Sequence, residues 1–404
     1  MSQLAKKNIF LQNIPKVFAL NFFMMFLVVI PIIVPYWESF QLKMEDVYKL
    51  QAIFAMTVIV LDIPMGYLSD ILSRKTCLIA MGIFNALSYQ FLLHGDTFYH
   101  FALFEFCAAI SVSLFSGTDI ALIYDSLDAA KIEEDNHMSF LGKRIYFSQI
   151  GETFGSLLGG YLAATSLKNP VWVNSFTAII PFFIALTVHE PPRVKLNHRN
   201  HFENIKFMMK SLFGHSTLLT TMIIFNIAYG FSTFAAVWAF QSYWKAADVP
   251  LQYYGYLWAS FNLVVAILAR NAGRIEKKCS SIGVVLMAGI SPILGYFLMA
   301  YFKYHWAYVF AIFFALTRSL NSVVVQDGIN ARVPNSMRAT TNSFCSLGMR
   351  SVFVVLGPWI GRSIDQHGVH QTFYKLSGVY VLFFILILIP LALQRKQFRP
   401  LKTN

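Results

Sequence analysis

Charged residues are scarce in this sequence. Asp, Glu, Lys and Arg together make up 13% of its 404 residues, whereas a typical soluble domain carries about 25%. Hydrophobic residues make up 56%, and the mean hydropathy is +0.55. This shortage of charge excludes a water-soluble globular protein and indicates an integral membrane protein.

Cysteine is also rare, and the residue patterns of a catalytic centre are missing. The four cysteines, Cys77, Cys107, Cys279 and Cys345, fall in or beside apolar runs and lack the spacing of metal ligands. The sequence contains no ATP-binding Walker loop, no nucleophile–base pair and no cluster of metal ligands. We therefore expect no enzymatic activity, no catalytic residue, no metal and no cofactor.

Long apolar runs take up most of the chain. A helix that crosses a membrane needs roughly 20 mainly apolar residues. Runs of this kind predict an all-α membrane protein with twelve transmembrane helices. The predicted helices cover about residues 17–37, 47–69, 76–94, 98–127, 140–165, 170–189, 216–244, 251–271, 279–302, 304–331, 337–360 and 373–394.

The basic residues favour one orientation of these helices. If both termini are cytoplasmic, cytoplasmic segments contain 23 of the 32 Lys and Arg residues and outer segments contain seven. The positive-inside rule therefore predicts cytoplasmic termini, and we expect a bacterial inner membrane. The same asymmetry explains the net charge of +12 without a nucleic-acid partner. The two remaining basic residues, Arg318 and Arg350, lie near the middle of predicted helices.

The sequence carries a weak internal repeat. An offset of 202 residues takes Asp125 to Asp327 and relates several glycines of the two halves. The repeat predicts two six-helix halves, residues 1–189 and 216–404, joined by a cytoplasmic linker at 190–215.

The linker contains one amphipathic pattern. Ile205, Met208, Met209 and Leu212 recur at helical spacing beside lysines. This pattern predicts a helix that lies on the inner leaflet of the bilayer.

A polar stretch between two apolar runs has a distinctive residue order. Gly66, Asp70, Arg74 and Lys75 fall in the order G-x-L-x-D-x-x-x-R-K. This order resembles the signature of the loop between helices 2 and 3 in the major facilitator superfamily of secondary transporters. The resemblance implies two pseudo-symmetric six-helix halves and transport by alternating access.

The resemblance also implies a conformational latch. Asp70 would hold the two halves together on the cytoplasmic side, and we place Gly66, Arg74 and Lys75 in the same latch. Two further latch residues, Arg144 and Asp125, are expected near the cytoplasmic helix ends. Because an aspartate recurs in both halves, we expect Asp125 to pair with Arg144 or to cap a helix.

Small residues form a second pattern, on the fifth predicted helix. Gly151, Gly155, Ser156, Gly159 and Gly160 resemble the antiporter signature G-x-x-x-G-P-x-x-G-G, with serine in place of the proline. Small residues at this spacing let helices approach closely. The pattern is compatible with an antiport-specific role or with plain helix packing.

Acidic residues inside predicted helices are candidates for ion coupling. A charge at the centre of a membrane helix costs about 2.5–3.5 kcal/mol, so it normally faces a cavity or a partner. We select Glu105, Asp119, Glu152 and Asp62 on this ground. Glu105 and Asp119 are nearly four helical turns apart, so we expect them to share one face of the fourth helix.

The second half supplies basic and polar candidates for substrate binding. Arginine binds carboxylates through two parallel hydrogen bonds, so membrane arginines suit an anionic substrate. The candidate substrate-binding residues are Arg318, Arg350, Asn321, Ser343, Ser346 and Asn226.

These patterns together predict an ion-gradient-driven secondary transporter, acting as a monomer in the lipid bilayer. The substrate would be a small organic solute with anionic groups, such as a carboxylate siderophore or an organic acid, and the coupling ion would be H⁺ or Na⁺. A proton-coupled multidrug exporter is the alternative, because residues 116–127 and 338–343 resemble segments of bacterial drug-exporter-like members. A receptor or scaffold that does not transport is a further alternative.

Overall fold

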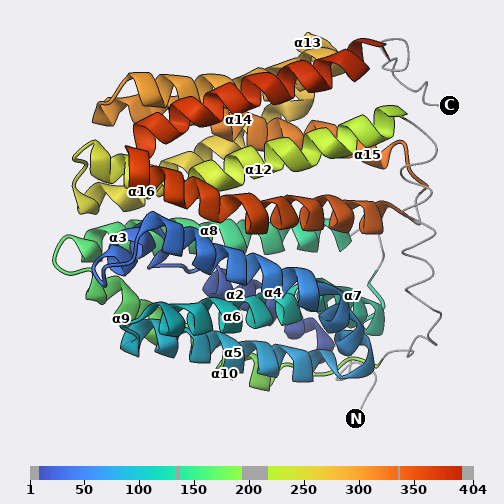
Figure 1. The fold of residues 1–404 in the computed structure, drawn as a ribbon. Helices are drawn as coiled ribbons and strands as arrows, with labels where there is room; N and C mark the ends of the chain where they lie inside the picture. Colours follow the sequence, from blue (N-terminus) through green and yellow to red (C-terminus); the bar gives the residue numbers. More distant parts are fainter. Residues whose placement is uncertain (1–8, 133–136, 193–216, 335–336, 394–404) are drawn as a thin grey trace. The chain divides into compact units, whose positions relative to one another are not determined.

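The computed structural model describes residues 9–132, 137–192, 217–334 and 337–393, and these residues form helices and turns without a β-strand (Figure 1). The side chains of Gly66 to Ile71 are not described. The predicted linker helix at 205–212 lies outside the described residues. The chain divides into two compact units, which we describe separately.

The first unit comprises Met1–Asn197 together with Pro250–Ala259. Its helices are α2 (Asn13–Met24), the 3₁₀ helix η1 (Ile30–Ile32), α3 (Ile33–Glu38), α4 (Met44–Ile71), α5 (Arg74–His94), α6 (Phe98–Phe115), α7 (Thr118–Ala129), α8 (His137–Ala163), α9 (Lys168–Thr177), α10 (Ile180–Thr187), η3 (Leu251–Tyr253) and the start of α13.

The second unit comprises His198–Val249 and Ser260–Asn404. Its helices are α12 (Thr217–Ala246), the rest of α13 (Tyr254–Tyr301), the 3₁₀ helix η4 (His305–Ala311), α14 (Ile312–Leu320), the π-helix η5 (Asn321–Val325), α15 (Gln326–Asn330) and α16 (Arg338–Leu393).

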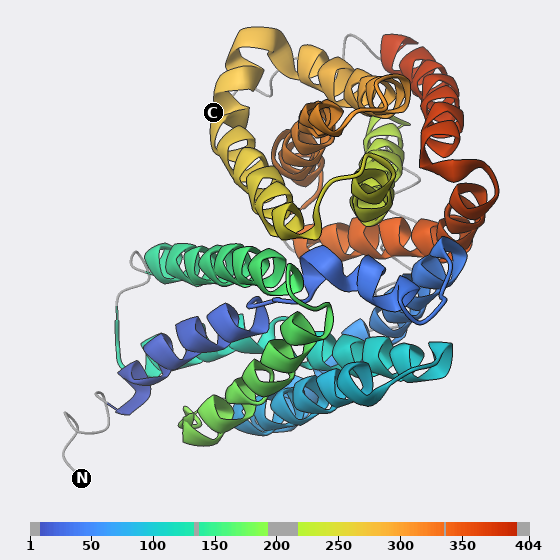
Figure 2. The ribbon, with the colours of Figure 1, turned by 90° about the vertical axis from the view of Figure 1, so that its left-hand side faces the viewer.

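Two of these helices are interrupted near their middle. Ser280 in α13 has φ 65° and ψ 161°, and Gly368 in α16 has φ 77° and ψ 162°. Backbone at positive φ cannot continue a right-handed helix. Each of these long elements therefore consists of two helical segments that meet at a turn (Figure 2).

Seven stretches among the described residues are long and apolar enough to cross a membrane. Two of them, Leu251–Tyr301 and Thr340–Ile387, contain 51 and 48 residues. A single crossing needs roughly 20, and these are the two stretches interrupted at Ser280 and Gly368. The described helices thus place the chain in a membrane, and the number of twelve crossings stays a prediction.

The fourth predicted helix is not continuous. Ser116 (φ −55°, ψ 118°) and Gly117 (φ 79°) separate α6 from α7. Glycine reaches positive φ without the steric cost that a Cβ brings, which is why the break falls there. The expectation of a continuous helix over 98–127 is therefore wrong, although Phe98–Ala129 together form one stretch long and apolar enough to cross the membrane.

The first predicted helix, 17–37, is also broken. Residues 25–29 between α2 and η1 leave the helical path before Pro31, which has no backbone N–H. Asn174 of α9 compensates the freed backbone. Its Oδ1 accepts from the Val29 N–H at 2.9 Å and its Nδ2 donates to the Phe26 carbonyl at 3.1 Å. Such side-chain replacement is what allows irregular backbone within a membrane protein.

The glycine face of α8 packs directly on the backbone of this broken segment. A Cβ on Gly155 would lie 2.8 Å from the Leu27 nitrogen, and one on Gly159 would overlap the Val28 carbonyl oxygen. The small residues therefore allow a close approach of α8 to the first helix pair. Close packing therefore gives the small residues of this pattern a structural role, and an antiport-specific role stays a prediction.

Candidate functional site

The break in the fourth predicted helix places Asp119 in the first turn of α7. Its side chain is completely buried, at 0% exposure. The N-terminus of a helix carries partial positive charge, which stabilises a nearby carboxylate. The two acids contact different helices, Asp119 a side chain of α2 and Glu105 a side chain of α4.

Asp119 is the centre of a buried polar network in the first unit. Its Oδ2 accepts a hydrogen bond from Asn21 Nδ2 of α2 at 3.1 Å and pairs with Arg144 Nε of α8. Asn21 Oδ1 in turn accepts from the Ser148 hydroxyl at 3.2 Å. Asp119 Oδ1 has no hydrogen-bond partner among the described residues. We call Asn21, Asp119, Arg144 and Ser148 the Asp119 network.

This network corrects one predicted pairing. Arg144 pairs with Asp119 and not with Asp125, whose Oδ2 accepts from Arg74 Nε at 3.2 Å. A buried acid requires a cation more strongly than a partly exposed one, because an unpaired buried charge is far more costly. The expected partner was Asp125, because burial of the aspartates could not be deduced from the sequence.

Glu105 belongs to a separate buried contact. Its carboxylate accepts from Gln51 Nε2 of α4 at 2.6 Å, and the residue is 4% exposed. Among the described residues no basic side chain pairs with Glu105. Gln51 was not predicted, although it lies on the apolar second helix where an amide is unusual.

The other two acidic candidates are less buried. Glu152 on α8 is partly buried, and its Oε1 accepts from the Trp258 indole N–H at 3.2 Å. Asp62 on α4 is also partly buried. Neither residue is part of the Asp119 network.

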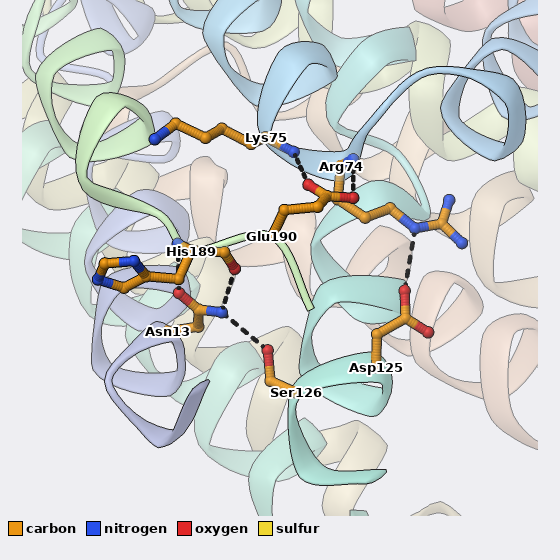
Figure 3. Close-up of polar contacts among 7 residues, drawn as sticks. All are labelled: Asn13, Arg74, Lys75, Asp125, Ser126, His189 and Glu190. Carbon is orange, nitrogen blue, oxygen red and sulfur yellow. Dashed lines mark hydrogen bonds and ion pairs between the residues drawn. The ribbon is translucent and has the colours of Figure 1, made fainter. Parts of the chain in front are cut away.

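A second polar cluster joins helix ends in the first unit (Figure 3). The Glu190 carboxylate, just after α10, accepts from the backbone N–H groups of Arg74 at 3.0 Å and Lys75 at 2.9 Å. N–H groups in the first turn of a helix have no partner within the helix, so Glu190 caps α5. Arg74 continues the cluster to Asp125 on α7.

Asn13 adds α2 to this cluster. Its Nδ2 donates to the Ser126 hydroxyl at 3.0 Å and to the His189 carbonyl at 2.7 Å, and its Oδ1 accepts from the His189 N–H at 2.9 Å (Figure 3). Burial, Lys16 and Lys75 lower the pKa of His189.

Only some of the predicted latch residues lie in this cluster. Arg74 and Lys75 meet through Glu190, which was not predicted, and the Arg74 side chain contacts Asp125 directly. Glu190 precedes two prolines at the end of an apolar run, and that position was the available signal. Gly66 and Asp70 lie in the last turns of α4 with undescribed side chains, so the latch stays a prediction.

In the second unit, amide side chains form a chain of hydrogen bonds. Asn226 Nδ2 of α12 donates to Asn321 Oδ1 and to Gln326 Oε1, both at 3.3 Å. Asn321 Nδ2 returns a bond to the Asn226 carbonyl at 3.0 Å, and Gln326 Nε2 donates to Asn342 Oδ1 at 2.5 Å. Asn321 opens the π-helix η5, and such helices are frequent at functional sites.

The amide chain parallels the Asp119 network. Asn226 bonds to Asn321 in the second unit as Asn21 bonds to Asp119 in the first. Asn321 is the residue that the 202-residue offset relates to Asp119. The fold therefore repeats this contact, and only the first unit makes it with a charged group.

The predicted substrate residues lie around the amide chain with different exposure. Asn226 and Asn321 are buried, whereas Arg318, one turn before Asn321, is exposed. Ser343 and Ser346 are exposed on α16, and Arg350 on the same helix is partly buried. Both arginines interact with other groups of the chain.

Comparison with known proteins identifies the family. The profile of the Major Facilitator Superfamily matches residues 17–358. The chain belongs to the Major Facilitator Superfamily. The transporter is 21% identical, over 81% of its own length and 84% of the relative's, to an uncharacterised MFS-type transporter of Methanocaldococcus jannaschii.

Solved structures share the fold. The nucleoside transporter NupG has a TM-score of 0.78 at 12% identity, covering 93% of this chain and 98% of that one. A POT family transporter in complex with 5-aminolevulinic acid has a TM-score of 0.74 at 10% identity, covering 96% and 97%. A bacterial homologue of the human lysosomal transporter Spinster gives 0.69 at 16% identity, covering 96% of each chain.

Membership of the family confirms several expectations. The chain is an integral membrane protein and a secondary transporter of a small molecule, and it is not an enzyme. The likeness to solved structures at these identities concerns the fold, so the substrates of those proteins do not carry over.

Proposed function

We propose that this transporter moves a small organic solute with anionic groups by alternating access, driven by a proton gradient, and that Asp119 carries the proton. The observation that carries this proposal is the completely buried Asp119 carboxylate, which pairs with Arg144 on one oxygen and has no partner for the other among the described residues. Buried ionisable groups in membrane helices typically mark proton relays and ion paths.

The surroundings of Asp119 favour H⁺ over Na⁺. Its described partners, Asn21 Nδ2 and Arg144 Nε, are hydrogen-bond donors and would repel a metal cation. A proton on Oδ1 neutralises the carboxylate and leaves Arg144 without its counter-ion. Losing one partner of a buried pair costs about 3–5 kcal/mol. A membrane potential supplies about 2.3 kcal/mol per charge per 100 mV, so at 100 mV it offsets only part of this cost, and a new acceptor for Arg144 must offset the rest.

The role of Arg144 in this proposal differs from a latch. When Asp119 is protonated, the Arg144 guanidinium must bind another acceptor. The conformation in which it does so is the second state of the transport cycle. Among the described residues, no basic side chain pairs with Glu105, whose carboxylate accepts from Gln51. Glu152 accepts a hydrogen bond from an indole N–H. We therefore assign coupling to Asp119 and treat Glu105, Glu152 and Asp62 as secondary candidates.

The second unit would recognise the substrate. Arg318 and Arg350 offer guanidinium groups to carboxylates, and Asn226 and Asn321 offer amide groups at the start of a π-helix. Ser343 and Ser346 complete the proposed site. A carboxylate siderophore or an organic acid has the matching chemistry.

We also propose the number of membrane crossings and the side of the membrane on which the termini lie. Twelve crossings agree with the breaks at Ser280 and Gly368 and with the family, and the distribution of Lys and Arg supports cytoplasmic termini. The proposed halves are 1–189 and 216–404, with a monomeric transporter in a bacterial inner membrane.

Uptake in proteoliposomes tests the proposed function. Purified protein is given labelled carboxylates, carboxylate siderophores, cationic drugs and neutral solutes under an imposed H⁺ or Na⁺ gradient. The proposal predicts accumulation of an anionic solute that depends on the H⁺ gradient. Accumulation of cationic drugs without dependence on Arg318 or Arg350 would instead establish the multidrug exporter.

A further inference from the structure

A groove in the second unit runs between α12 and the two segments of α16. Its volume is about 470 Å³. Most of its lining is apolar and comes from residues such as Ile227, Phe231, Leu356, Val379 and Phe383. The groove is separate from the amide chain and from the Asp119 network.

The polar residues of the groove gather at one end. Ser363, Thr372 and Lys375 line it on either side of the turn at Gly368. The hydroxyl groups of Ser363 and Thr372 lie 3.0 Å apart, and Thr372 donates to the Gly368 carbonyl at 2.9 Å. Lys375 is the only charged residue in the lining and is exposed. No described residue forms an ion pair with its ammonium.

The apolar part has the depth of one leaflet. Val352 lies eleven residues before Ser363 on the first segment of α16, and Phe383 lies eleven residues after Thr372 on the second. Eleven residues of helix span roughly 16 Å, which is about half of a hydrocarbon core of about 30 Å. The groove therefore runs from the turn at one membrane surface to about the middle of the bilayer.

The groove is open along its length. Trp359 is 75% exposed and Val379 is 45% exposed, so lipid can enter from the side. An apolar trough that ends at an ammonium with no ion pair among the described residues matches a molecule with one long chain and an anionic head.

We propose that this groove is a specific site for an anionic phospholipid, with one acyl chain between α12 and α16 and the phosphate at Lys375. A lysine beside a membrane surface attracts anionic headgroups with about 1 kcal/mol each. A zwitterionic lipid of the same chain length would make the same apolar contacts but would lack most of this attraction to Lys375.

Native mass spectrometry of the full chain in detergent tests the headgroup. Phosphatidylglycerol and phosphatidylcholine with identical acyl chains are added in equal amounts. We expect the first phosphatidylglycerol to bind about fivefold more tightly, Lys375→Ala to bring the ratio close to one, and Lys375→Glu to reverse it. Lys168→Ala, which removes an exposed lysine far from the groove in sequence, should keep the ratio. Equal binding of both lipids by the native chain, or an unchanged ratio in Lys375→Ala, overturns the proposal.

Fluorescence quenching tests the position of the acyl chain. Trp359 lines the groove only four residues from Ser363, at its polar end. Bromine atoms on acyl carbons near the headgroup should therefore quench Trp359 more than bromines near the terminal methyl, and Trp359→Phe should abolish this difference. If native protein and Trp359→Phe are quenched identically by both brominated lipids, the chain does not occupy the groove.

Discussion

Asp119 combines full burial, a basic partner and an oxygen without a hydrogen bond, a combination not found in the other described carboxylates. Glu105 is almost as buried but is held by an amide, and Asp125 has an arginine partner but lies partly exposed. Proton binding has the largest effect on an acid that forms an ion pair, because the proton removes the charge that holds the basic partner. At the scale of single residues, this distinguishes Asp119 from the other acids of the first unit.

The first prediction concerns the basic partner of this acid. Arg144→Ala leaves the buried Asp119 without a counter-ion and should lower the free energy of unfolding by about 3–5 kcal/mol. Adding Asp119→Asn to it should recover most of that loss. Thermal unfolding in detergent measures both effects. Lys49→Ala removes an exposed lysine with two acidic neighbours and should cost at most about 1 kcal/mol. Equal losses in Arg144→Ala and Lys49→Ala would show that the pair is not structurally important.

The second prediction concerns the substrate arginines. Arg318→Lys and Arg350→Lys should each weaken binding of an anionic substrate about tenfold, because a lysine cannot reproduce the planar two-pronged contact. Alanine at either position should weaken binding further. Equilibrium binding in detergent separates this effect from turnover, with Arg270→Lys as the exposed control. Unchanged affinity in both alanine variants, with intact folding, would reject the anion site.

At the scale of elements, breaks in helices create the candidate sites. Gly117 starts a new helix at Asp119, the π-helix η5 begins at Asn321, and Gly368 ends the lipid groove. Each break exposes backbone groups or redirects side chains that a continuous helix would hold elsewhere. The glycine face of α8 complements these breaks because it lets α8 contact the irregular backbone of residues 25–29.

The third prediction compares two glycines of α8. Gly159→Ala places a methyl group against the Val28 carbonyl oxygen and should destabilise the protein by about 1–3 kcal/mol. Nothing lies within 4 Å of a Cβ at Gly142, so Gly142→Ala should stabilise the helix by about 0.5–1 kcal/mol. Thermal unfolding of both variants measures the difference. A stable Gly159→Ala protein would contradict the close packing of α8 on the first helix pair.

The fourth prediction concerns the cap of α5. Glu190→Ala removes the acceptor for two free N–H groups and should cost about 0.5–2 kcal/mol. Hydrogen exchange should speed up at the amides of Arg74 and Lys75, since both donate to Glu190. The amides near His94 at the other end of α5 serve as the internal control. Unchanged exchange at the first turn would mean that Glu190 does not cap this helix in solution.

At the scale of the whole molecule, the sequence predicted the helical membrane class and the family, because both depend on composition and on a short loop signature. It also selected Asp119, Arg144, Asn226 and Asn321 as functional candidates. It did not predict that Arg144 pairs with Asp119, since the break at Gly117 changes the helix face and a periodicity argument assumes a continuous helix.

Other features of the sites could not be deduced from one sequence. Glu190 and Gln51 act through contacts between helices far apart in the chain. The lipid groove depends on the turn at Gly368, which brings Ser363 and Thr372 together. Apolar residues that line a groove and apolar residues that simply face lipid have the same pattern in sequence.

Gradient-driven uptake and exchange by Asp119→Asn, measured in the same proteoliposomes, test the central claim most directly. Asparagine keeps the size of the side chain and its hydrogen-bonding capacity but cannot exchange a proton. The account predicts that the variant loses accumulation driven by a pH gradient and keeps the exchange of labelled for unlabelled substrate, while Glu105→Gln keeps both. Accumulation by Asp119→Asn at the native rate, with unchanged dependence on the pH gradient, would contradict the assignment of Asp119 as the proton carrier.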